Sequence, residues 1–172
     1  MIRALVIRAL FVLLAFAALS PTLAADTVGI EDVVREIDLA AYEVILAAPV
    51  LRSYPVAAAL KRAEERGVPV YLLTEDRRLA DPKSFWGGLA FAGCALYAVP
   101  RVAGYTLILD GRVAIAGPLV GLPPSPTLPP TYQYTRSTEV YQRRKTIVSL
   151  MRSPYSSKIG METIVQLLHG GN

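Results

Sequence analysis

The sequence predicts an α/β domain with a mixed, mostly parallel sheet flanked by helices. Two observations lead to this class. Within residues 43–73, an apolar run, a helical pattern ending in glycine and a second apolar run follow one another, and this strand–helix–strand order makes the two strands parallel. Further along, Asp110-Gly111 lies between two apolar runs, which is a strong signal for an antiparallel hairpin. The length of 172 residues suits one domain.

Residues 1–25 have the pattern of a secretory signal peptide. Arg3 and Arg8 supply the positive start, residues 9–19 form an uncharged apolar run, and a Ser-Pro break with small residues follows. The run is shorter than the roughly 20 residues of a membrane span. Because Ala-Ala-Asp offers no unique cleavage point, an uncleaved anchor stays open, as does a buried first helix. We expect export to the periplasm or the extracellular space, with one domain over residues 26–172.

The first elements of this domain alternate between helix and strand. Apolar residues of 29–41 recur at i, i+3, i+4 and i+7, which predicts an amphipathic helix. Residues 43–49 are an apolar run typical of a buried strand. A second helix is expected over 53–67, with Ser53 as its N-cap and glycine at its end. Residues 68–73 form the next strand.

The second half contains shorter elements. A short helix weakened by two glycines is expected over 83–93, a strand over 95–100, and the hairpin over 104–117. Residues 118–131 are rich in proline and predict an extended surface loop, partly polyproline II. Two helical segments complete the chain, at residues 137–151 with Ser137 as cap and at residues 156–170.

Charge and cysteine content narrow the function classes. The formal net charge is +4, but two basic residues belong to the leader, so 16 remain against 14 acidic ones. This surplus is too small to predict nucleic-acid binding from charge alone. Cys94 is the one cysteine and has apolar neighbours, which predicts a buried, inert thiol. A lone cysteine excludes an intrachain disulfide and the common structural zinc patterns.

The order of these elements resembles one half of a phospholipase D-like domain. The text AALKRAEERGVPVYLLTED, within residues 57–76, is similar to the opening of that domain. The segment GYTLILDGRVAIAG, residues 104–117, resembles its catalytic hairpin. The resemblance runs from about Ile30 to Val120 and implies a phospholipase D/nuclease-like half.

This resemblance implies a specific chemistry. In the family, the hairpin has the pattern His-x-Lys-x4-Asp and is followed by Gly-Ser-x-Asn. The histidine attacks phosphorus to form a phosphohistidine, while the lysine and the asparagine hold phosphate oxygens. Two halves, from one chain or from a homodimer, form one site.

Most positions of this motif differ in the present chain. Asp110 and Gly117 match the aspartate and the glycine. The residues at the histidine, lysine, serine and asparagine positions are, in that order, Ala103, Tyr105, Pro118 and Val120. Every group that would touch phosphate is replaced, so we expect no catalytic residue, and neither a metal nor another cofactor.

Two further sets of residues outside the hairpin are candidates for a functional role. His169 is the one histidine; it lies near the chain end without a following lysine and is expected to have no catalytic role. Three carboxylates after a strand form either a cation site or a solvated loop held by Arg77 and Arg78; they are Glu75, Asp76 and Asp81.

One basic cluster with aromatic neighbours is a candidate for binding anions or nucleic acid. It consists of Arg143, Arg144 and Lys145, with Tyr132, Tyr134 and Tyr141 nearby. Such clusters contact nucleic-acid backbones or anionic lipid head groups. The alternative is an ordinary solvated helix face.

These observations favour an exported, non-catalytic phospholipase D-like domain that acts as a binding or structural module. A homodimer is expected from the resemblance, and the ligand class stays open between a protein, a lipid head group and a nucleic acid. One alternative is a diverged exported phosphodiesterase or nuclease that uses another nucleophile. Another is a small structural component of the cell envelope, with the proline-rich loop as its contact.

Overall fold

The computed structural model describes residues 25–169, so the predicted signal peptide lies outside the described residues except for Ala25. Eight strands form one mixed sheet with the order β1-β7-β6-β5-β2-β3-β4-β8. The strands are β1 (Asp26–Thr27), β2 (Val44–Ala47), β3 (Val70–Glu75), β4 (Ala95–Val99), β5 (Thr106–Leu109), β6 (Val113–Ala116), β7 (Tyr132–Tyr134) and β8 (Ser157–Lys158). This architecture confirms the predicted fold class.

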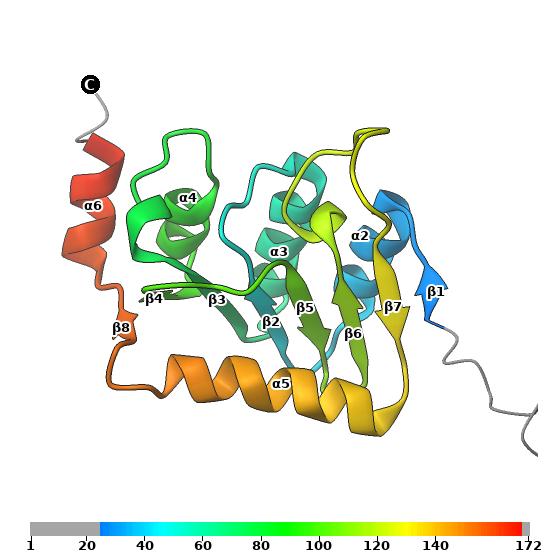
Figure 1. Cartoon of the computed structure of the whole chain (residues 1–172). Helices are drawn as coiled ribbons and strands as arrows, with labels where there is room; N and C mark the ends of the chain where they lie inside the picture. The colour runs from blue at the N-terminus through cyan, green and yellow to red at the C-terminus, as the bar shows by residue number, and fades with distance from the viewer. Residues whose placement is uncertain (1–24, 170–172) are drawn as a thin grey trace, which may run out of the picture.

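The helices lie on both faces of this sheet (Figure 1). They are α2 (Ile30–Leu39), α3 (Tyr54–Glu65), α4 (Trp86–Phe91), α5 (Ser137–Met151) and α6 (Met161–His169). Two short 3₁₀ turns, η1 (Asp76–Arg78) and η2 (Pro118–Val120), follow β3 and β6. Among residues 25–169, no helix has both the length and the apolar composition that crossing a membrane requires.

The sheet separates two apolar cores. The larger core joins α2, α3 and α4 to one face and includes the fully buried Trp86. The smaller core lies between the other face and α5, whose Val140 and Ile147 are buried. α6 packs against α4, beside the β8 edge (Figure 1).

The pairing of the strands decides which segments meet. β2 is parallel to β3, and β3 is parallel to β4, as the strand–helix–strand pattern predicts. β5 runs antiparallel to both β2 and β6, so the hairpin attaches beside the first parallel strand. The open end of the hairpin therefore lies at the carboxyl ends of β2, β3 and β4.

Several local predictions need correction. Ser53 occupies the N-cap position of α3, but its buried hydroxyl makes no hydrogen bond within the described residues. The N-cap of α5 is Arg136 rather than Ser137. The proline-rich segment begins as the η2 turn, in which Pro118 and Val120 are buried, and its exposed residues are 123–127 and 129–130.

Candidate functional site

The turn end of the β5–β6 hairpin is held by Asp110. Its carboxylate accepts hydrogen bonds from the backbone N–H groups of Tyr42 at 2.8 Å, of Glu43 at 3.0 Å and of Ala41 at 3.0 Å. Asp110 has a backbone φ of 53°, a value that residues other than glycine rarely adopt. These bonds tie the hairpin turn to the connection between α2 and β2.

The environment of Asp110 also sets its ionisation. Burial alone would raise the pKa of this carboxyl, but the three N–H donors and the nearby Arg112 together hold the pKa below its usual value. The residue is therefore a charged acceptor for backbone groups. It is separated from the open end of the hairpin by the length of β5.

At the open end, the residue at the histidine position is small and exposed. Ala103 and Gly104 are both exposed, and Gly104 has a φ of 88°. A cavity of about 200 Å³ lies beside them, between the end of β2 and α5. Its lining includes the guanidinium-bearing Arg143 and the hydroxyl-bearing Thr106 and Thr146. Among the described residues, neither a carboxylate nor an imidazole lines this cavity.

Tyr105, at the lysine position, packs on the face of the sheet that α2, α3 and α4 cover. A Cβ added to Gly121 would lie 2.6 Å from the Tyr105 ring, so the ring lies directly on this glycine. Burial raises the pKa of the Tyr105 hydroxyl, against the opposing charges of Arg52 and Arg78. At the position where the resemblance implies a lysine, this chain thus has a side chain used in packing.

The second half of the motif is also committed to packing. Gly117 has a φ of 143°, and a Cβ there would lie 2.6 Å from the Cα of Thr131. Pro118 is buried, and Val120 is fully buried in the larger core, which α2, α3 and α4 cover. The asparagine position therefore presents an apolar group to the core and no polar group to the open end.

The three carboxylates at the end of β3 and just after it do not come together as a cation site. Glu75 is buried, pairs with Arg77 at 2.7 Å and accepts a hydrogen bond from the N–H of Val102. Asp81 pairs instead with Arg52 at 2.6 Å. Within residues 25–169, no group of three potential metal ligands is found.

The arginine partners also shift the pKa of these carboxyls. The hydrogen bond from Arg77 holds the pKa of Glu75 below its usual value, although burial opposes it. The hydrogen bond from Arg52 does the same for Asp81. The predicted ion pair between Arg77 and a carboxylate of this loop is present. Among the described residues, Arg78 affects these carboxyls through its nearby charge. Both carboxylates therefore act as ion-pair partners near the open end.

The basic cluster of α5 is divided among different surroundings. Arg144 makes two hydrogen bonds to Glu43, at 2.6 Å and 3.0 Å. The guanidinium of Arg143 lies 4.1 Å from the centre of the Tyr134 ring, and Lys145 is exposed. Successive helical residues point about 100° apart, so the three cations do not form one patch. No local sequence pattern predicts Glu43 as the partner of Arg144.

Two residues singled out in the sequence lie away from the hairpin. His169 is the last residue of α6, and its side chain is outside the described part of the structure. Cys94 is buried beside β4, and burial raises the pKa of its thiol to about 12.

Comparison with known proteins gives structural matches only. No protein-family model and no curated protein matches the sequence. Nuc from Salmonella typhimurium, a phospholipase D family member, matches with a TM-score of 0.65 at 14% identity, over 75% of this chain and 89% of that chain. NucT from Helicobacter pylori matches with a TM-score of 0.62 at 14% identity, over 76% and 89%.

The fold is phospholipase D-like. A third structure, the archaeal chromatin protein TrmBL2, matches with a TM-score of 0.55 at 15% identity, over 92% of this chain and 64% of that chain. That structure is described as showing a novel mode of DNA binding. The matches to Nuc and NucT confirm the phospholipase D-like fold that the hairpin and the strand–helix–strand unit predicted.

Proposed function

We propose that this chain is an exported, non-catalytic phospholipase D-like domain that acts as a binding or structural module. The observation that carries the proposal is the fate of the motif positions. Ala103 offers no functional group, while Tyr105 and Val120 are used in packing. The residues at the lysine and asparagine positions, which hold phosphate oxygens in the family, thus contribute to packing in this chain.

The chemistry at the open end supports this proposal. Phosphoryl transfer in the family needs an imidazole nucleophile and cations that stabilise phosphate oxygens. The cavity beside Ala103 contains one guanidinium and two threonine hydroxyls, and Thr146 already donates its hydroxyl hydrogen to the carbonyl of Gln142. A hydroxyl without a neighbouring base is a weak nucleophile. A second copy of the chain would lack the same groups.

The turnover experiment uses a bulky substitution at the open end. Purified protein is assayed with bis(4-nitrophenyl) phosphate and with single- and double-stranded DNA, and we expect no turnover above that of buffer. Ala103→Trp would block the cavity, and Ala41→Trp makes the same change at an exposed alanine near the turn end. Turnover lost only in Ala103→Trp would establish the alternative, a diverged phosphodiesterase or nuclease.

Asp110→Ala is not a suitable control for turnover. Its carboxylate accepts hydrogen bonds from three backbone N–H groups, so its removal would disturb the fold whatever the function. Loss of activity in that variant would therefore not identify a catalytic group.

A homodimer through the open end is part of the proposal. Ala103 and Gly104 are small and exposed there, which would permit close approach of two copies around a two-fold axis. Ala103→Glu would place two like charges near that axis, and Ala41→Glu is the matched control. Light scattering on eluted peaks is expected to give a dimer for the parent and for Ala41→Glu, and a monomer for Ala103→Glu. A parent that is monomeric at high concentration contradicts the dimer.

Export rests on the pattern of residues 1–25 alone. Expression of the full chain in a bacterial host, with fractionation and N-terminal sequencing, tests it. We expect a mature chain beginning at Ala25 or Asp26 in the periplasm. Uncleaved chain in the membrane fraction would instead identify an anchor, and uncleaved chain in the cytosol would contradict export.

A further inference from the structure

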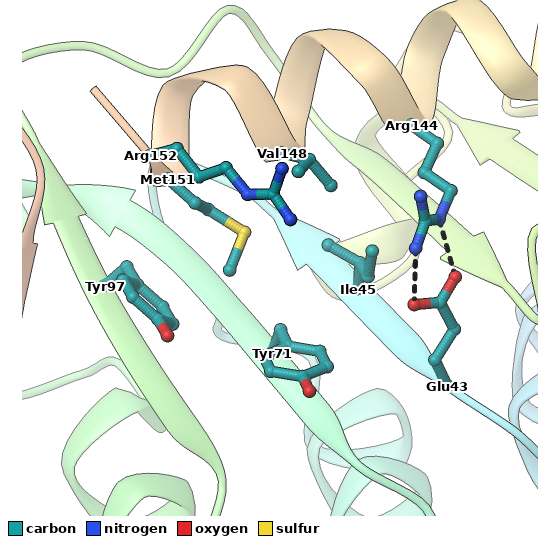
Figure 2. Close-up of a pocket in the computed structure, with 8 residues that line it drawn as sticks. All are labelled: Glu43, Ile45, Tyr71, Tyr97, Arg144, Val148, Met151 and Arg152. Carbon is teal, nitrogen blue, oxygen red and sulfur yellow. Dashed lines mark hydrogen bonds and ion pairs between the residues drawn. The ribbon is translucent and has the colours of Figure 1, made fainter.

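A pocket with unused polar groups lies on the α5 face of the sheet, away from the motif positions. It has a volume of about 250 Å³. Tyr71 of β3 and Tyr97 of β4 contribute to one wall, and Met151 and Arg152 at the end of α5 contribute to the other. The paired Glu43 and Arg144 close one end, as Figure 2 shows.

The polar groups of this pocket fall into two classes. Glu43 and Arg144 satisfy each other through two hydrogen bonds. Among the described residues, no hydrogen bond or ion pair engages the hydroxyls of Tyr71 and Tyr97 or the guanidinium of Arg152. Both tyrosines are half-buried. Three groups able to donate hydrogen bonds therefore line the pocket without a protein acceptor.

The charge of the pocket favours an anion. Arg144 is neutralised by Glu43, so the positive charge of Arg152 remains. Lys158 of β8 is the cross-strand partner of Tyr97, and such partners point to the same face of a sheet. A guanidinium binds carboxylate and phosphate with two parallel hydrogen bonds. An anionic group at Arg152 would use both its charge and its geometry.

The size and the tyrosine rings define the rest of the ligand. Drug-sized ligands occupy pockets of about 300–1,000 Å³, so a pocket of about 250 Å³ suits a single ring. Tyr71 and Tyr97 lie on neighbouring parallel strands, and Ile45 and Met151 add apolar surface. Aromatic rings pair edge-to-face or in offset stacks.

We propose that this pocket binds a single-ring aromatic anion. The carboxylate or phosphate of the ligand lies at Arg152, while the ring lies against Tyr71 and Tyr97. This binding site is independent of the open end of the hairpin and goes beyond the proposed function. The proposed domain would therefore bind a small molecule in addition to its partner.

The test observes the methionine methyl groups by ¹³C NMR in the full chain. The sequence has three methionines, of which Met151 lines the pocket and Met161 belongs to α6. The probes are sodium benzoate and phenyl phosphate, with neutral benzamide and non-aromatic acetate as comparisons. We expect benzoate or phenyl phosphate to shift the Met151 signal saturably without moving that of Met161. The tighter of the two identifies the anionic group.

Two variants test the assigned contacts. Arg152→Gln removes the charge at an exposed position, and we expect affinity to fall about tenfold or more, as for loss of a charged hydrogen bond. Tyr97→Leu removes one ring and is also expected to weaken binding. Lys145→Gln, an exposed change on the same helix, is expected to leave affinity unchanged.

Three results would overturn this inference. They are the absence of a saturable Met151 shift with either anion, an equal response to benzamide, and an affinity of Arg152→Gln equal to that of the parent. Unfolding curves of the variants establish that each one is folded. None of these measurements depends on the motif positions, so their failure leaves the proposed function unaffected.

Discussion

The two ends of the β5–β6 hairpin differ in what their side chains do. At the turn end, the Asp110 carboxylate accepts hydrogen bonds from three backbone N–H groups and thereby holds the hairpin against the α2–β2 connection. At the open end, Ala103 is an exposed methyl group, and Tyr105 and Val120 pack with their neighbours. The first end has the aspartate of the motif that this hairpin resembles, and the second end has no histidine, lysine or asparagine at the corresponding positions.

This difference separates folding from chemistry within one motif. A partly buried carboxylate that accepts hydrogen bonds from several N–H groups stabilises the turn whether or not catalysis occurs. A nucleophile and its cations contribute little to folding. The scaffold therefore does not need the nucleophile or its cations, and removing the Asp110 carboxylate is expected to cost more stability than changing the exposed Ala103.

The largest expected effect is that of Asp110→Asn at the turn end. The amide has one acceptor oxygen in place of the two carboxylate oxygens and brings an NH₂ group toward N–H donors. We expect the free energy of unfolding to fall by about 2–4 kcal/mol. Urea unfolding monitored by circular dichroism measures it.

Ala103→Ser is the corresponding change at the open end. Ala103 is exposed, and surface substitutions usually change stability by at most about 0.5 kcal/mol. Equal losses of stability in Asp110→Asn and Ala103→Ser would remove the contrast between the two ends.

The ionisation of Asp110 predicts a pH dependence. Because its pKa is lowered in the folded state, the associated stability is fully present above the unfolded value of 3.8 and is lost as pH falls through the folded value. Stability of the parent should therefore decrease more steeply below pH 3.8 than that of Asp110→Asn. Parallel acid-unfolding curves for the two proteins would show that this carboxyl carries no such stability.

Tyr105→Lys restores the family residue at the open end and is expected to have an intermediate cost. The change leaves space above Gly121 and brings an ammonium group near the charges of Arg52 and Arg78. We expect a loss of about 1–3 kcal/mol. Tyr105→Phe, which keeps the ring, should stay within about 0.5 kcal/mol of the parent. A Tyr105→Lys variant as stable as the parent would show that the ring is not needed for packing.

The ion pair between Glu43 and Arg144 is expected to have a smaller effect than the Tyr105 ring. It connects α5 to the residue whose N–H also donates to Asp110. Arg144 is 40% exposed, so solvent screens the pair, and its coupling should be about 1 kcal/mol or less. A double-mutant cycle of Glu43→Gln and Arg144→Gln, measured by urea unfolding, gives the value. A much larger coupling would mean that α5 contributes strongly to the turn end.

Much of the fold could be predicted because its elements follow local patterns. The apolar periodicity of α2, the Gly67 end of α3 and the Asp110-Gly111 turn all depend on residues close in sequence. The helix over Ser137–Met151 is found at the predicted bounds. These local features are sufficient to predict the phospholipase D-like fold from the sequence.

The remaining features depend on distant partners. β1, β7 and β8 have two or three residues each and exist because they pair with other strands. Arg144 finds Glu43 across 101 positions of sequence, which no local pattern encodes. For the same reason, the packing of Tyr105 against Gly121 and the pocket under α5 became visible only in three dimensions.

The most direct test of the central claim is a search for a covalent intermediate. The purified chain is incubated with excess bis(4-nitrophenyl) phosphate, quenched, and analysed by intact-mass and peptide mass spectrometry. The account predicts that the protein mass stays unchanged and that no peptide gains a phosphoryl group. A phosphoryl adduct on any side chain, formed in the folded protein and absent after denaturation, would contradict it.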